Sequence, residues 1–373
     1  MKRIISVVLV LGLVLVSLTG CGTGSTDAGS VKIAIAGPMT GDFAEYGTGF
    51  RNAVELMVNE WNENGGVLGQ QIELVIYDDK NDGEEAATIA ERIASDNQIM
   101  GVVGHFASGV CMAATPTYQE TGIVNISPSA SHPDFTKEGD FIFRNNTVIN
   151  VEAEAAVAIA TELYGKKKVG ILSARTDWGA STAEITKELV KAAGAEVVDH
   201  QEILDGTVDF SPNISRLHNA GAEVIIVAAM YNVLGPFASQ YQDVNPDIQF
   251  VGFSNAYSRQ LIELAGDSAE GIHFPTQFFD GSTEENVVAF VNAYQEAYGS
   301  TPSSLTAQAY DSAGIILTAI QNAGKTDRTA IRDQVAGIEY EGVTGFTTFN
   351  EFRDSVRPFT VVKIHQGEFV EVK

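Results

Sequence analysis

Short apolar runs alternate along the chain with longer stretches in which apolar residues recur at helical spacing. The runs at 31–36 and 72–77 are typical of buried strands, and the stretch between them places Phe50, Val54 and Trp61 on one helix face. The alternation continues with predicted strands at 100–103 and 123–126 and helices opening at Asp82 and at 108–120. Strand and helix in regular turn predict a parallel, doubly wound α/β sheet.

A second series of the same kind begins after residue 147. Its predicted strands lie at 168–172, 196–203, 224–228, 248–251 and 271–274, and its helices at 151–163, 178–193 and 259–264 and from 211 and 233. Residues 284–323 have a mostly helical pattern, and 346–372 have the pattern of strands with turns. We therefore predict two α/β lobes, formed by 31–147 with 277–355 and by 148–276 with 356–373.

The first residues have the pattern of an export signal. A basic start precedes an apolar segment at 4–18, which is short for a membrane span, and Leu18-Thr19-Gly20-Cys21 resembles a bacterial lipobox. This pattern predicts a signal peptide at 1–20, lipidation of Cys21 and a flexible tether at 21–30. The exported protein would then be anchored at the outer face of the cytoplasmic membrane or in the periplasm. An ordinary signal peptide followed by a chance cysteine is the alternative.

The composition is that of a folded protein, with 45% apolar and 19% charged residues among 373. A formal net charge of −25 repels phosphate backbones and anionic headgroups, so we expect no nucleic-acid partner. Cys21 and Cys111 are the only cysteines, so lipidation of Cys21 leaves no disulfide and no thiolate metal site. We also expect a monomer.

Motifs for catalysis or cofactor binding are missing from the sequence. It contains no Walker A motif and no Gly-x-Ser-x-Gly elbow, and its six histidines are scattered. Gly47-Thr48-Gly49 lacks the third glycine of a dinucleotide fingerprint, because Asn52 stands at that position. We therefore expect a binding protein and not an enzyme, with no cofactor and no metal.

The loops that follow the predicted first-lobe strands carry groups suited to a small ligand. The loops at 39–46, 104–109 and 127–131 lie where open α/β sheets bind ligands. The last two offer serine hydroxyls and backbone N–H groups near helix starts, which together hold a carboxylate without a basic residue. In the alternative interpretation, Ser108 serves only as a helix N-cap.

Five segments stand in one order along the chain: Ile35-Ala-Gly-Pro-Met-Thr-Gly41 with Tyr46-Gly47, Gly65-Gly-Val-Leu-Gly69 with Tyr77-Asp-Asp79, Val103-Gly-His-Phe-Ala-Ser108, Ile126-Ser-Pro-Ser-Ala-Ser131, and Gly266-Asp-Ser-Ala-Glu-Gly271. Together they resemble the type I periplasmic binding proteins of the branched-chain amino acid (Leu/Ile/Val) uptake family. The resemblance implies two doubly wound parallel-sheet lobes joined by a three-strand hinge. It also implies an extracytoplasmic receptor that delivers its ligand to the permease of an ABC importer.

The resemblance also implies roles for the residues at matching positions. Ser108, the hydroxyl of Ser131 and the backbone at Ser129 and Ala130 would hold the α-carboxylate of an amino acid, and Tyr46 would cover the site. The other implied ligand-binding residues are Trp178, Met230, Tyr231, Ser254 and, on the hinge side, Tyr310.

One position departs from the family pattern. The amino acid binders place an acid at the position of Ser254, where it pairs with the ligand ammonium, and a buried ammonium without a carboxylate is costly. Either Asp177 or Glu45 substitutes, or the ligand has no amine. In the first case the ligand is an amino acid, either branched-chain or aromatic. In the second case it is an aromatic acid, a 2-oxo acid or a small amide such as urea. A ligand sensor for a membrane receptor is the other alternative to transport.

Overall fold

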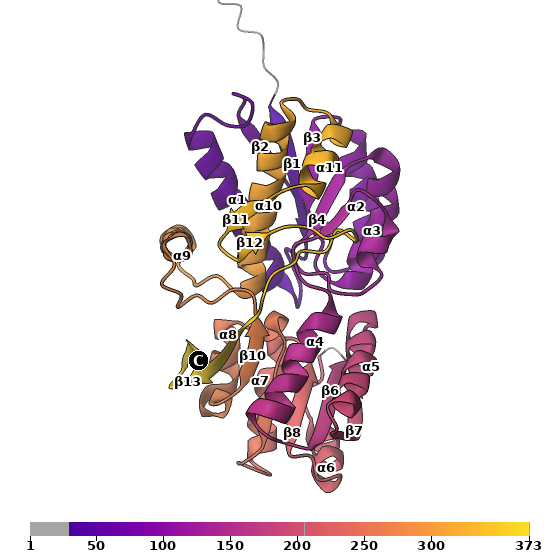
Figure 1. Cartoon of the computed structure of the whole chain (residues 1–373), viewed down its shortest axis with the longest axis vertical. Coiled ribbons are helices and arrows are strands. Elements are labelled where there is room, and N and C mark those ends of the chain that lie inside the picture. Colours follow the sequence, from indigo (N-terminus) through magenta and orange to yellow (C-terminus); the bar gives the residue numbers. More distant parts are fainter. Residues whose placement is uncertain (1–29, 205, 373) are drawn as a thin grey trace, which may run out of the picture.

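The computed structural model describes residues 30–204 and 206–372, so the predicted signal peptide and the lipidation site at Cys21 lie outside the described residues. The described chain forms two lobes, one above the other in Figure 1, each built on its own sheet. Within these residues, no helix is long and apolar enough to cross a membrane.

The first lobe contains a five-stranded sheet in the order β2-β1-β3-β4-β5, and all its pairings are parallel. Its strands are β1 (Val31–Gly37), β2 (Ile72–Asp78), β3 (Ile99–Val103), β4 (Val124–Ser127) and β5 (Ile142–Arg144). Buried side chains of helices α1 and α10 share one core cluster, and those of α2 and α3 another, as expected for helices on both faces of the sheet. These helices are α1 (Ala44–Glu63), α2 (Gly83–Ser95), α3 (Ser108–Thr121) and α10 (Ser304–Ala323).

The second lobe contains a seven-stranded sheet in the order β14-β13-β10-β9-β8-β6-β7. Only the pairings that involve β13 and β14 are antiparallel. Its strands are β6 (Lys168–Ala174), β7 (Glu196–Ile203), β8 (Val224–Ala228), β9 (Gln249–Val251), β10 (His273–Thr276), β13 (Thr360–His365) and β14 (Glu368–Glu371). Its helices are α4 (Ile149–Ala158, continued by a π-helical turn at Ile159–Leu163), α5 (Asp177–Ala192), α6 (Ser211–Asn219), α7 (Tyr231–Gln242) and α8 (Arg259–Ala265).

The chain passes between the lobes three times, at 145–148, 277–284 and 348–359, which confirms the predicted two-lobed fold with its three-segment hinge. After the second passage the chain forms α9 (Glu285–Tyr298) and then α10, which packs against α1 of the first lobe. The exact lobe limits, 31–147 with 277–355 and 148–276 with 356–373, stay a prediction. Short 3₁₀ turns lie at Phe135–Glu138, Ser254–Ala256 (η3) and Gly266–Ala269.

Two local predictions need correction. The loop predicted at 39–46 is shorter, because α1 begins at Ala44 and Tyr46 lies in its first turn. Gly47 lets that turn approach the preceding loop, since a Cβ there would lie 2.1 Å from the carbonyl oxygen of Pro38. The sequence analysis also missed α11 (Arg328–Ala336) and the hairpin of β11 (Tyr340–Gly342) and β12 (Gly345–Thr347).

Arg144, at the end of β5, connects the loop after β4 to the third passage between the lobes. Its side chain is fully buried, and its Nε lies 2.5 Å from Asp354 Oδ1. Its guanidinium also donates to the backbone carbonyls of Ala130 and His132. Because these carbonyls flank Ser131, the buried Arg144 and its ion pair with Asp354 hold in place a loop that was predicted to bind ligand.

We predict that Asp354→Ala lowers the free energy of unfolding by about 3–5 kcal/mol, because it leaves the buried Arg144 charge without a partner. Urea unfolding followed by circular dichroism measures this loss. Asp140→Ala is the matched control, since Asp140 forms only exposed ion pairs and its loss should cost at most about 1 kcal/mol. Equal losses in the two variants would contradict the prediction.

Candidate ligand-binding site

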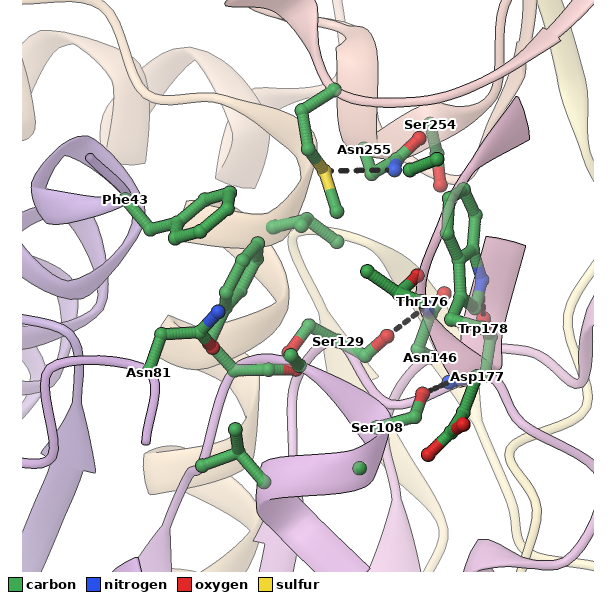
Figure 2. A pocket seen from close by; sticks show the side chains of 18 of the residues that line it. Phe43, Asn81, Ser108, Ser129, Asn146, Thr176, Asp177, Trp178, Ser254 and Asn255 are labelled. Carbon is green, nitrogen blue, oxygen red and sulfur yellow. Dashed lines mark hydrogen bonds between the residues drawn. The ribbon is translucent and has the colours of Figure 1, made fainter. Parts of the chain in front are cut away.

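A cavity of about 420 Å³ lies between the lobes. The first lobe lines it with the loops after β1, β2, β3 and β4, and the second lobe with the loops after β6, β8 and β9. Glu152 of α4, Leu305 of α10 and Asn146 of the hinge complete the wall. Figure 2 shows Ser108 and Ser129 across the pocket from Ser254 and Asn255. The carboxyl ends of the parallel strands in both sheets therefore meet at one enclosed space.

Ser108 is the first residue of α3, and its side chain lines the cavity. Its Oγ accepts hydrogen bonds from the backbone N–H groups of Ser131 and His132, each at 3.3 Å, so its own proton remains available to a ligand. The N-cap of α3 is Ala107, without a side-chain cap, so the interpretation of Ser108 as only an N-cap is wrong. A hydroxyl donor at an uncapped helix N-terminus favours an anionic group.

Some polar groups of the loop after β4 form hydrogen bonds with other protein groups and are not free to bind a ligand. The Ser129 hydroxyl lines the cavity but donates to the carbonyl of Phe106 at 2.7 Å. Ala130 is buried outside the cavity wall, and its N–H donates to Ser127 Oγ. Ser131 lines the cavity, and its Oγ accepts from Trp178, so its proton also remains available. Ser108 and Ser131 are therefore the two hydroxyl donors that this side offers to a ligand.

Trp178, in the first turn of α5, reaches from the second lobe to the first. Its Nε1 donates to Ser131 Oγ at 2.7 Å, and its ring meets Phe253 edge-on with centroids 6.1 Å apart. Two more hydrogen bonds cross between the lobes, from Tyr46 Oη to the carbonyl of Asn255 and from Ser258 Oγ to Glu45, both at 2.7 Å. The lobes are thus joined around the cavity, in a closed arrangement.

Met230 and Ser254 also line the cavity, as the sequence analysis placed them in the site. Three predicted tyrosines do not. Tyr46 stacks on Phe106 behind the cavity wall at 4.4 Å between ring centroids, and Tyr231 lies against Tyr46. Tyr310 is farther off, since its hydroxyl donates to Glu60 at 2.5 Å on α1. The first two tyrosines support the wall, and Tyr310 lies apart from it.

The sequence analysis missed an acid that the structure brings into the site. Glu152 lies in the first turn of α4, is 2% exposed and lines the cavity. Its Oε1 accepts the backbone N–H of Ser254 at 2.6 Å. Burial raises the pKa of Glu152 to about 7, although the hydrogen bonds from Ser254 oppose the rise. A signal existed, because Glu152 shares a helix face with Ile149 and Ala156, both buried.

The two acids proposed earlier as substitutes lie in different places. Asp177 lines the cavity but is exposed. Glu45 lies outside the cavity wall, where burial raises its pKa and hydrogen bonds from Tyr231 and Ser258 oppose that rise. Among the described residues that line the cavity there is no lysine, arginine or histidine. The cavity thus combines hydroxyl donors with carboxylates and offers a ligand no cationic side chain.

Comparisons with known proteins identify the family and support the fold. A family model described as periplasmic binding protein matches residues 30–368. The leucine-, isoleucine-, valine-, threonine- and alanine-binding protein of Pseudomonas aeruginosa is 30% identical over 94% of each chain. The branched-chain amino acid transporter substrate-binding protein LivJ of Streptococcus pneumoniae, solved with isoleucine, is 27% identical with a TM-score of 0.84, covering 92% of this chain and 100% of that one.

A more distant structure shares the fold alone. The solute-binding protein of an ABC transporter from R. palustris, solved with benzoate, is 20% identical with a TM-score of 0.84, covering 92% of this chain and 96% of that one. The family match spans almost all of the described chain, in both lobes and through the hinge. The chain therefore belongs to the periplasmic binding protein family, whose members bind solutes for transport.

Proposed function

We propose that this protein binds an amino acid in the cavity between its lobes and delivers it to an ABC importer, without catalysing a reaction. The observation that carries the proposal is the charge pattern of the cavity, which offers the hydroxyls of Ser108 and Ser131 on the first lobe and the buried carboxylate of Glu152 on the second. A zwitterion fits both sides, with its carboxylate at Ser108 and Ser131 and its ammonium toward the second lobe.

An acid without an amine fits this cavity less well. Its negative charge would meet Glu152 and Asp177, and no cationic side chain among the described lining residues would offset the repulsion. The likeness to the benzoate binder concerns the fold and does not favour an aromatic acid. The charge pattern thus favours an amino acid over the amine-free alternatives.

The side chain of the ligand is proposed to be apolar. Phe43, Phe106, Met230, Val233 and Leu305 line the cavity, and its volume suits a small molecule. The name of the relative from Pseudomonas aeruginosa, at 30% identity, supports aliphatic amino acids such as leucine, isoleucine and valine. Desolvating an apolar side chain against these residues would supply much of the affinity.

The remaining parts of the proposal concern delivery. Lipidation of Cys21 would keep the protein, as a monomer, near the membrane in which the permease lies. Closure of the lobes around the ligand would present the surface that the permease recognises. The three hydrogen bonds between the lobes support a closed form that ligand binding stabilises.

The proposal predicts that aliphatic L-amino acids raise the melting temperature of the purified mature protein by linkage. A ligand present at about 100 times its Kd stabilises the folded state by about 2.7 kcal/mol, which gives a rise of several degrees. Thermal-shift scans with amino acids, 2-oxo acids, aromatic acids and urea measure it. A rise with amine-free acids and none with amino acids would refute the proposal.

A second prediction concerns the carboxylate side. Ser108→Ala should weaken amino acid binding by about tenfold or more, because a hydrogen bond to a charged group is lost. Isothermal titration calorimetry measures the Kd. The amide derivative of the same amino acid is the control ligand, since it has no carboxylate and its weak binding should change little. An unchanged Kd for the amino acid would remove Ser108 from the site.

A third prediction uses the two tryptophans, Trp61 and Trp178. Trp178 lines the cavity, whereas Trp61 lies on α1 away from it, so ligand binding should change the fluorescence of Trp178 alone. Addition of an amino acid should therefore change the emission of Trp61→Phe as in wild type and leave Trp178→Phe without a change. A change in the emission of Trp178→Phe and none in Trp61→Phe would show that the ligand binds outside this cavity.

A further inference from the structure

The acid expected at Ser254 is supplied from another element. Glu152 belongs to α4, 102 residues earlier in the chain, yet its Oε1 receives the backbone N–H of Ser254 at 2.6 Å. The two residues form one part of the cavity wall. A carboxylate therefore stands beside the point where the resemblance places one, although neither residue 254 nor its neighbour Asn255 is acidic.

Glu152 differs from the other buried acids of the described chain in how its charge is balanced. Asp79 lies 2.6 Å from His105. Asp311 accepts from the backbone and hydroxyl of Thr344, and nearby Arg357 favours its charged form. Among the residues that the structure describes, Glu152 has Ser254 as its only hydrogen-bond partner, and no neighbouring cation favours its charged form. A buried carboxylate that opens on a cavity and has no counter-charge either takes up a proton or binds a cation from the cavity.

We propose that Glu152 is the specificity-determining residue that binds the ammonium group of the ligand, in place of the acid missing at Ser254. This inference rests on the proposed function and deepens it, because it makes the free amine a requirement. Deaminated 2-oxo acids and N-acylated amino acids then belong to the excluded ligands. Ser254 acts as a positioning residue, since its backbone N–H orients the carboxylate.

Binding of an ammonium group at Glu152 should depend on pH. The empty site holds Glu152 with a pKa of about 7, raised by burial, so binding of an ammonium below that pH must release a proton. Affinity should therefore rise with pH, by up to about tenfold per unit below pH 7, and level off above it. α-Amino acids keep their charges throughout this range. No other titratable residue of α4 or of the elements packed against it contributes to the pKa of Glu152. These residues are Glu154 on α4, Glu162 in the π-helical turn, Asp177, Glu184, Lys187, Glu188 and Lys191 on α5, and His273 on β10.

The test compares Glu152→Gln with Glu154→Gln, the same change on an exposed residue of the same helix. Calorimetry with L-leucine, L-isoleucine, L-valine and the other common L-amino acids gives each Kd, and 4-methyl-2-oxopentanoate serves as the deaminated form of leucine. We expect Glu152→Gln to weaken amino acid binding at least about thirtyfold and Glu154→Gln to leave it unchanged. The oxo acid should bind Glu152→Gln at least as well as wild type. The pH dependence should disappear in Glu152→Gln.

Folding is controlled in the same experiment. Burial of the Glu152 charge destabilises the folded protein when the pH lies above the pKa that Glu152 has in the unfolded chain. Glu152→Gln removes this charge, so the variant should melt no lower than wild type at pH 7. The double variant Glu152→Gln/Ser254→Glu returns a carboxylate to the same part of the cavity wall, at the position where the resemblance places one, and should recover at least part of the lost affinity.

The outcomes separate the two proposals. If wild type binds amino acids and Glu152→Gln binds them equally, with the same pH dependence, the inference is wrong and the proposed function stands. If wild type binds no amino acid, or only amine-free acids, the proposed function fails and the role of Glu152 fails with it.

Discussion

The parallel strands of both sheets end at the gap between the lobes, and the position of every group in the site depends on this arrangement. Loops after β1, β2, β3 and β4 meet loops after β6, β8 and β9 there, so polar side chains far apart in sequence line one cavity. The hinge keeps the two sets of loops facing each other, and the buried Arg144, paired with Asp354, fixes the loop that carries Ser131. The cavity is thus a product of topology, and its selectivity is a product of a few side chains.

Charge balance decides which ligand this cavity favours. The first lobe offers hydroxyls at the start of α3, which suit a carboxylate, and the second lobe offers a buried carboxylate that has no cationic partner among the described residues. In a low-dielectric space, an unpaired Glu152 is stable when protonated or when a ligand cation reaches it. In this account, the folded chain supplies the anion of an ion pair, and the ligand supplies the cation. This links closure of the lobes to the presence of an amine.

Much of the fold was predictable because a parallel strand that is buried on both faces has a continuous run of apolar residues in the sequence, as at Val224–Ala228. α11 escaped prediction because only Ile331 and Val335 of its residues are buried, too few for a clear period. The hydroxyls of Ser108 and Ser131 could be proposed from local motifs and the family resemblance. Glu152 could not be proposed as a site residue, since its place in the cavity wall depends on contact with Ser254, 102 residues away in the sequence. Sequence spacing shows that a glutamate is buried and does not show which cavity it faces.

The central claim is that the ligand lies between the lobes with its amine on Glu152. A crystal structure of the mature protein with a bound amino acid measures this directly. We expect the ammonium nitrogen within about 3 Å of a Glu152 carboxylate oxygen and the ligand carboxylate at the hydroxyls of Ser108 and Ser131. A ligand bound in the reverse orientation, or an ammonium held by Asp177 with Glu152 contacting only Ser254, would contradict it.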